Sequence, residues 1–237
     1  MKDVMRIFNE YAKTYDLKDK AIMNKFHHSY RVMEYSIEIA KSLKLNDEDI
    51  RVTAIAGLFH DIARFKQWTK YKTFIDSKSF DHGDIGYKIL KEELIDKIDL
   101  DEEEKNVVLN AVRFHNKYRI DDNLSHIEET ITNIVRDADK LDIMTEQGFI
   151  TKEYEIKDSL VNNLLEHRLI NNNLVETDMD ELFRIIAFIF DLNYKYSYDY
   201  LLKKQIIENK INLLEIYGNK DLKFLEEDLI KYMKERL

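Results

Sequence analysis

The chain has 237 residues, and its formal net charge of −9 at pH 7 opposes polymeric nucleic acid as a partner. Hydrophobic residues make up 44% and charged residues 35%, which excludes both a disordered chain and a membrane protein. Because cysteine is absent, disulfides, thiolate zinc sites and cysteine nucleophiles are excluded, and histidine and carboxylate side chains would have to hold any metal.

Helices are predicted along the whole chain, because proline is absent and only five glycines occur. Apolar residues recur at helical intervals, as Val32, Tyr35 and Ile39 do, and sustained alternation with a period of two is absent. We predict helices at roughly 3–15, 25–44, 47–64, 82–96, 101–117, 125–146, 155–170, 178–217 with a break inside, and 219–236. Asn46 and Asp81 are suited to cap the helices that follow them. The fold class is therefore all-α.

Residues 65–80 show no clear helical or strand period and are predicted to form a loop. The segment is rich in aromatic and basic residues, and it begins four positions after Asp61. A long loop in this place is a natural lid or substrate-binding segment. The alternative is that Trp68, Tyr71 and Phe74 fill the edge of the core.

Four histidines on four different predicted helices lie where an apolar stripe points inward, namely His28, His60, His82 and His115. A fifth, His167, has an inward position but no matching carboxylate close to it in the sequence. A single histidine on an apolar face is usually a core residue with satisfied hydrogen bonds. Four such histidines beside buried carboxylates favour a metal site instead.

The carboxylates for such a site are expected from two places. Asp61 directly follows His60, so that on a helix the two side chains diverge by about 100° and reach one ion from neighbouring positions. Imidazole nitrogen beside carboxylate oxygen suits Mn, Fe, Co, Ni or Mg better than a closed tetrahedral zinc site. Three aspartates within 137–142 lie in an otherwise apolar helix and need partners. At least one of Asp137 and Asp142 is expected to pair with Arg136, Lys140 or solvent.

Five sequence elements carry a resemblance to a known family. They are His28-Ser29-Tyr30-Arg31-Val32, Leu58-Phe59-His60-Asp61-Ile62-Ala63-Arg64, Asp81-His82-Gly83-Asp84-Ile85-Gly86, Phe114-His115, and Asp137-Ala138-Asp139-Lys140-Leu141-Asp142. Their order resembles the H…HD…H…H…D signature of the HD superfamily of metal-dependent phosphohydrolases. The resemblance implies an HD-domain helical bundle with additional C-terminal helices. We expect one helical domain over 1–237, with an HD core at about 25–145 and a C-terminal helical extension at about 150–237.

The resemblance also implies a set of metal ligands. These are His28, His60, Asp61 and Asp139 for a first ion, and His82 and His115 for a second ion. Asp139 takes the place of the aspartate in the family's Ala-Asp-x-Leu element, and Asp61 would bridge the two ions. Because six ligands exceed what one octahedral ion with an open position needs, we expect two ions per chain. If only one ion binds, His82 and His115 would be a general acid or substrate contacts.

The expected activity is hydrolysis of a small phosphate ester by metal-activated water, with a nucleotide as the substrate class that the family implies. Mn or Fe is the expected metal, and Mg, Co or Ni are alternatives. Arg64 follows His60 by four residues and Lys140 adjoins Asp139, so both are candidates to neutralise charge on phosphoryl oxygens. The alternative is ordinary ion pairing, of Arg64 with a helix-end carbonyl and of Lys140 with Asp137.

Two other functions share these residues. Some HD-type proteins hold two irons with the same ligand order and activate oxygen, and a non-catalytic module that senses a nucleotide would bind its ligand without turnover. No Gly-x-Ser-x-Gly, P-loop or Gly-x-Gly-x-x-Gly element occurs, so serine hydrolase, P-loop and dinucleotide-binding functions have no support.

The C-terminal part is rich in aromatic residues, namely Phe183, Phe188, Phe190, Tyr194, Tyr196, Tyr198 and Tyr200. We expect it to form helical core that covers the HD helices, and a homodimer surface is the alternative. The apolar run 185–190 is six residues long, against the ~20 needed to span a bilayer, and no apolar signal segment follows Met1. A cytoplasmic location is expected by default.

Overall fold

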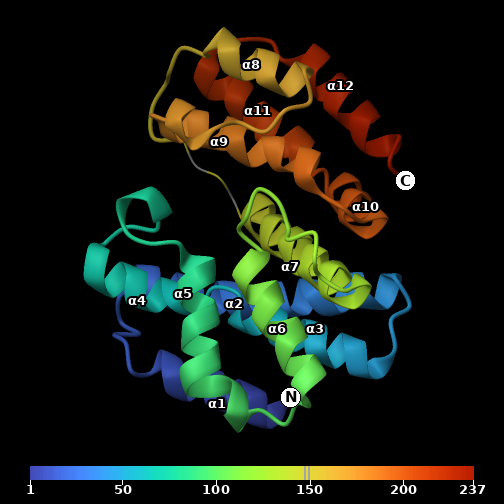
Figure 1. Cartoon of the computed structure of the whole chain (residues 1–237). Coiled ribbons are helices and arrows are strands. Elements are labelled where there is room, and N and C mark those ends of the chain that lie inside the picture. The colour runs from blue at the N-terminus through green and yellow to red at the C-terminus, as the bar shows by residue number, and fades with distance from the viewer. Residues whose placement is uncertain (147, 149) are drawn as a thin grey trace. The chain divides into compact units, whose positions relative to one another are not determined.

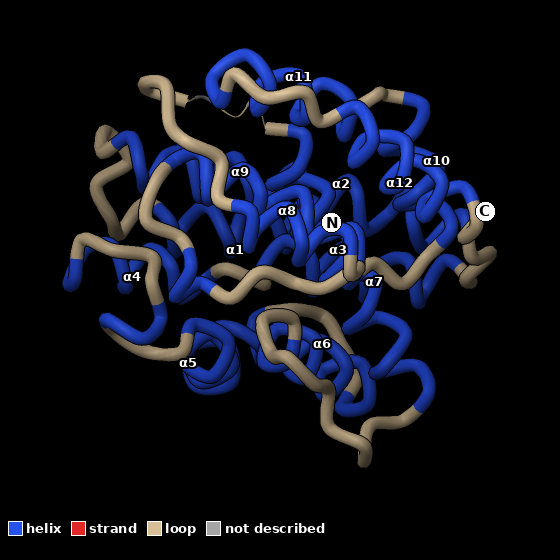
Figure 2. Tube along the Cα trace, turned by 90° about the horizontal axis from the view of Figure 1, so that it is seen from above, coloured by secondary structure: helices blue, strands red, loops and turns tan. Residues whose placement is uncertain are grey.

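The computed structural model describes residues 1–146, 148 and 150–237. Every regular element among these residues is a helix or a short helical turn, which confirms the all-α prediction (Figures 1 and 2). The chain divides into two compact units, Met1–Asp139 and Lys140–Leu237. In the described part of the chain, no helix is both long enough and apolar enough to cross a membrane.

The first unit contains six complete helices and most of a seventh. They are α1 (Lys2–Ala12), α2 (Lys20–Ser42), α3 (Asp47–Phe59), α4 (Ile62–Tyr71), α5 (His82–Ile89), α6 (Glu102–Phe114) and α7 (His126–Thr145), which runs through the point of division. Short turns occupy 76–78, 90–94 and 95–97. In α3, every residue from Val52 to Phe59 is buried, which makes this helix the centre of the unit. Phe8 of α1 is fully buried and places its ring against Phe59 at a centroid distance of 5.6 Å.

Side-chain caps define where several of these helices begin. The Asn46 side chain accepts a hydrogen bond from the backbone N–H of Asp49, and Asp81 accepts one from Asp84, so both predicted caps are confirmed. Asp19 caps α2 through the N–H of Ala21. Because of this cap, α2 starts five residues before the predicted position 25.

The predicted helix 47–64 and the predicted loop 65–80 are both wrong in extent. The helix stops at Phe59, and Asp61 has a non-helical backbone, with φ −103° and ψ 20°, before α4 begins at Ile62. Ile62, Ala63 and Phe65 are fully buried, and this apolar side holds residues 62–71 in a helix. The loop is therefore confined to 72–81. Trp68 packs against the core and stacks on Phe74, with ring centroids 5.0 Å apart.

The second unit contains the helices α8 (Asp158–Leu165), α9 (Asp178–Ile186), α10 (Lys195–Lys203), α11 (Ile206–Gly218) and α12 (Lys223–Lys234), with helical turns at 172–174 and 187–191. The break predicted inside 178–217 is present twice. A turn follows α9, and Gln205, with φ 52°, separates α10 from α11. Phe183 and Tyr198 are buried within this unit. Whether the chain forms a homodimer stays a prediction.

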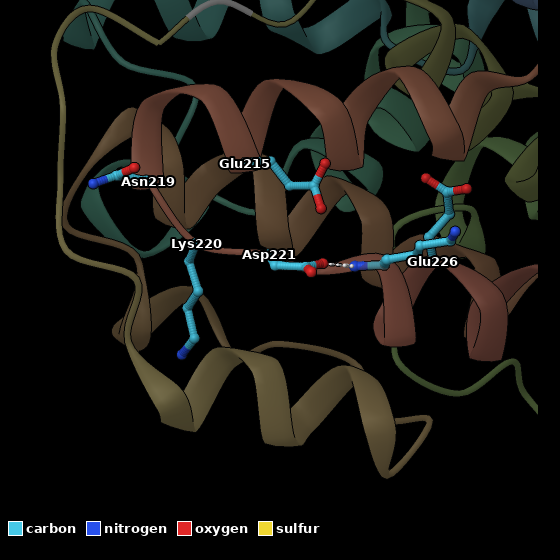
Figure 3. Close-up of a pocket in the computed structure, with 6 residues that line it drawn as sticks. Glu215, Asn219, Lys220, Asp221 and Glu226 are labelled. Atoms are coloured by element: carbon cyan, nitrogen blue, oxygen red, sulfur yellow. Dashed lines mark hydrogen bonds between the residues drawn. The ribbon is translucent and has the colours of Figure 1, made fainter.

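An open polar pocket lies at the junction of α11 and α12 (Figure 3). Two of its carboxylates stabilise the connection between α11 and α12. Glu215 Oε1 accepts a hydrogen bond from the backbone N–H of Leu222 at 2.7 Å, and Asp221 Oδ1 accepts one from that of Lys223 at 2.9 Å. The lining residues are Glu215, Asn219, Lys220, Asp221, Lys223 and Glu226, and they include none of the predicted ligands. We assign no chemistry to this pocket.

Gly57 is required where α2 and α3 pack closely. A methyl group on Gly57 would lie 2.6 Å from Ser36 Oγ and 3.2 Å from the backbone Cα of Met33. We expect Gly57→Ala to lower the free energy of unfolding by about 1–2 kcal/mol, because the overpacking outweighs the better helix propensity of alanine. Urea denaturation followed by circular dichroism measures the change.

The control for this prediction is Ser36→Ala. Ser36 Oγ is buried without a hydrogen-bond partner, so removing it costs little and opens space for the new methyl group. The double variant Ser36→Ala/Gly57→Ala should recover part of the lost stability. Unchanged stability in Gly57→Ala alone would contradict the close approach.

Candidate metal centre

All six predicted ligands come together in the first unit. His28 lies on α2, His60 and Asp61 lie between α3 and α4, His82 begins α5, His115 follows α6, and Asp139 lies on α7. Asp139 is partly exposed, and the other five are at most 5% exposed. Arg136 of α7, also buried, donates to the carbonyl oxygens of His115 and Lys117, and so fixes the end of α6.

One half of the cluster joins His28, His60 and Asp139. The Nε2 atom of His28 lies 3.1 Å from Asp139 Oδ1 and 3.2 Å from the Nε2 atom of His60. Asp61 turns its Oδ2 atom toward this half, at 3.5 Å from His28 Nε2 and 3.6 Å from His60 Nε2. The ligand atoms of His28, His60 and Asp139 all lie within 4.8 Å of one another.

The other half joins His82 and His115 on the opposite oxygen of the same carboxylate. Asp61 Oδ1 lies 3.5 Å from His82 Nε2 and 3.8 Å from His115 Nε2, and these two nitrogens are 3.0 Å apart. His60, Asp61 and His115 also form a group with ligand atoms within 4.8 Å. Neighbouring ligands of an octahedral ion are about 3 Å apart, because each lies about 2.1 Å from the metal. The observed spacings are near this value or moderately longer.

The hydrogen bonds of the ring Nδ1 atoms show which nitrogens are available to a metal. The Nδ1 atoms of His60 and His115 lie 2.8 Å from the carbonyl oxygens of Gly57 and Val112, and that of His82 lies 2.6 Å from Asp76 Oδ2. Because these oxygens only accept, each Nδ1 carries a proton, and Nε2 is the ring nitrogen left to face a metal. Two bare Nε2 atoms 3.0 Å apart repel each other unless positive charge lies between them. This donor set therefore fits a divalent cation.

A family model of the HD domain matches residues 26–144. This chain belongs to the HD family. The match confirms the resemblance on which the ligand set was predicted. A search of curated proteins found no match. A search of solved structures found a crystal structure of a predicted HD superfamily hydrolase involved in NAD metabolism from Clostridium acetobutylicum, with 21% identity over 98% of this chain and 97% of that chain and a TM-score of 0.40.

Charges around the HD pair keep the candidate ligands in the forms that bind metal. Burial alone would raise the pKa of Asp61, but Lys25, His60 and Arg64 hold it well below the ordinary value. Burial would likewise raise the pKa of Asp139, and the neighbouring imidazoles of His28 and His60 lower it instead. Burial lowers the pKa of His115. An ionised carboxylate at Asp61 and Asp139 and a neutral imidazole at His115 are the forms required for metal binding, and these shifts favour them.

Lys25 also contacts the candidate metal centre, and no sequence prediction named it. Its ammonium lies 2.8 Å from Asp61 Oδ2, and the side chain is 19% exposed. The residue precedes His28 by three positions on α2, and this i,i+3 spacing was the available signal. A lysine three residues from an inward histidine does not stand out among the 37 Lys and Arg residues of the chain.

Arg64 and Lys140 have defined partners. Arg64 Nε lies 3.2 Å from Asp61 Oδ1, and its Nη1 donates to the carbonyl of Phe74 at 2.6 Å and to Asp76 at 3.0 Å. Lys140 Nζ lies 2.9 Å from Asp191 Oδ2 in the second unit. A role of either cation toward a phosphoryl group stays a prediction. His167, which has no matching carboxylate nearby in the sequence, pairs with Asp228 at 2.8 Å.

Proposed function

We propose that this HD protein is a metal-dependent phosphohydrolase whose substrate is a small phosphate ester, with nucleotides as the first class to test. The observation that carries the proposal is the position of Asp61. Its two carboxylate oxygens face two sets of histidine Nε2 atoms, at distances of 3.5 to 3.8 Å. One carboxylate between two imidazole sets is suited to bridge two divalent ions.

The proposed ligands are His28, His60, Asp61 and Asp139 for one ion, and Asp61, His82 and His115 for the other. Such ions supply a water molecule activated for attack and neutralise charge on phosphoryl oxygens. The side chains around the ions would hold the ligands in position. Hydrogen bonds from Nδ1 hold the rings of His60, His82 and His115 in place, so that little reorganisation is needed on binding.

Positive charge for the substrate is proposed to come first from Lys25. Both cations contact Asp61, but Arg64 is also held by the loop through the carbonyl of Phe74 and the carboxylate of Asp76. A partly exposed ammonium is well suited to meet a phosphate as a point charge. Arg64 is proposed to orient Asp61, with a second role toward the phosphoryl group as the sequence predicted.

The test of this function combines metal analysis with a phosphate-release screen. Purified protein supplied with excess Mn or Fe should contain two ions per chain and should release phosphate from at least one nucleoside mono-, di- or triphosphate. His82→Ala and His115→Ala should each lower the metal content to one. A content of one in the unaltered protein would overturn the two-ion site.

Two histidines outside the cluster serve as controls. His27 lies beside the ring of Phe26, and His126 begins α7, and neither belongs to the candidate metal groups among the described residues. His27→Ala and His126→Ala should keep the full metal content. Aerobic, iron-dependent oxidation of a substrate without phosphate release would show that the site performs oxygen chemistry instead.

A further inference from the structure

The loop 72–81 places one carboxylate directly behind the candidate metal centre. Asp76 Oδ2 accepts a hydrogen bond from His82 Nδ1 at 2.6 Å and one from the backbone N–H of His82 at 3.2 Å. Asp76 Oδ1 accepts from Arg64 Nη1 and from Gln67 Nε2, each at 3.0 Å. Asn116 Nδ2 lies 3.3 Å from Asp76 Oδ2 and 3.3 Å from His82 Nδ1, so Asp76 is the nearer partner of the ring and the one that can accept its proton. No sequence pattern singled out this residue.

The three rings with a defined Nδ1 partner obtain it in two different ways. His60 and His115 each donate to a carbonyl three residues earlier, at the end of their own helix, so their partners are supplied by α3 and α6. His82 is the first residue of α5 and has no helical turn before it. Its ring therefore depends on a side chain from the loop, and Asp76 supplies it.

Asp76 also reaches the bridging carboxylate through a second path. Arg64 donates through Nη1 to Asp76 and lies with Nε 3.2 Å from Asp61 Oδ1. The same Nη1 binds the carbonyl oxygen of Phe74 at 2.6 Å. Gln67, which is fully buried, donates to both Asp76 and Ser79 and so fixes the loop on α4. The loop conformation and the orientation of Asp61 and His82 are thus held by one hydrogen-bond network.

We propose that Asp76 is a positioning residue that holds His82 in the tautomer with a bare Nε2 and makes the second half of the metal centre dependent on the folded loop 72–81. The part of this inference that concerns a second ion rests on the proposed function. The part that concerns the His82 tautomer does not, because the tautomer can be measured without metal. Carboxylates behind metal-binding histidines act in this way by fixing the tautomer and the ring direction. Loss of Asp76 should therefore weaken the second ion much more than the first, since only the second uses His82 and Arg64 keeps its bond to the Phe74 carbonyl.

The experiment compares Asp76→Ala with the unaltered protein by calorimetric titration with Mn²⁺. We expect the affinity for the second ion to fall by about 10–100-fold, and that for the first ion to stay within about threefold. In the metal-free protein, long-range ¹H–¹⁵N NMR should show an unprotonated Nε2 on His82, with the signal assigned by its loss in His82→Gln. In Asp76→Ala the ring should populate both tautomers. Asp76→Asn is the second variant, should the alanine variant not fold.

Asp81→Ala is the matched control, because Asp81 caps α5 and binds Asn116 but does not bind the His82 ring. It should destabilise the protein and leave the second-ion affinity within about threefold of the unaltered value. Equal losses in Asp76→Ala and Asp81→Ala would overturn the proposal, because the cause would then be the loosening of α5. An unchanged His82 tautomer in Asp76→Ala would also overturn it. A single ion in the unaltered protein would refute the two-ion function alone, since the tautomer measurement still decides the role of Asp76.

Discussion

Replacing Asp61 by Asn is expected to abolish binding of both metal ions and phosphohydrolase activity, while the helical content survives. The substitution removes the negative charge and the bridging capacity of the carboxylate whose two oxygens face His28 and His60 on one side and His82 and His115 on the other. A metal ion contributes several kcal/mol of transition-state stabilisation, so its loss should lower the rate of hydrolysis by about a thousandfold or more. Metal analysis, a phosphate-release assay and far-UV circular dichroism measure the three outcomes.

Asp84→Asn provides the control for this first prediction. Asp84 lies in the HD core on α5, but its carboxylate pairs with Arg113 and Lys117 and is 43% exposed. An exposed ion pair of this kind contributes little, so metal content, activity and stability should change only slightly. Full metal content in Asp61→Asn would remove Asp61 from the site.

Asp139→Asn is expected to weaken metal binding, and Asp137→Asn is expected to lower stability without weakening metal binding. Asp139 Oδ1 lies 3.1 Å from His28 Nε2 and 3.6 Å from His60 Nε2, so its loss should weaken the first ion by more than the roughly 100-fold typical of an outer partner. Asp137 is fully buried and belongs to neither candidate metal group among the described residues. Its replacement should spare metal affinity and lower the free energy of unfolding by about 1–3 kcal/mol.

Titration with Mn²⁺ and urea denaturation of the metal-free variants separate these two effects. The aspartates are two positions apart and point about 200° apart on a helix, so both cannot face one ion without distortion. Loss of metal in Asp137→Asn with retention in Asp139→Asn would show that the Ala-Asp-x-Leu element was matched at the wrong residue.

The ligand cluster could be anticipated from the sequence because each histidine lies on an apolar stripe of its own helix. What joined the four helices into one site was the resemblance, since helical periodicity says which side points inward but not which helices are neighbours. Asp76 and Lys25 could not be found in this way. Asp76 lies in an irregular loop without a period, and Lys25 resembles many other surface lysines on a helix.

Errors in the predicted helix boundaries have a common physical cause. The separation of α3 from α4 at His60-Asp61 was not predicted, and inside 178–217 one break was predicted where the chain has two, after α9 and at Gln205. Neither proline nor glycine marks these points. Tertiary packing ends these helices, and local propensity does not reveal it. The start of α4 was hidden similarly, because its buried face is defined by contacts with α1 and α2 residues far away in the chain.

Lys25 acts as an internal counter-ion for Asp61. Its ammonium neutralises the oxygen that a divalent ion would bind, so the metal-free protein keeps a buried carboxylate ionised without a proton. A divalent ion at Oδ2 would compete with this ammonium for the same oxygen and would repel it. The positive charge that now balances Asp61 would then be available to a bound anion.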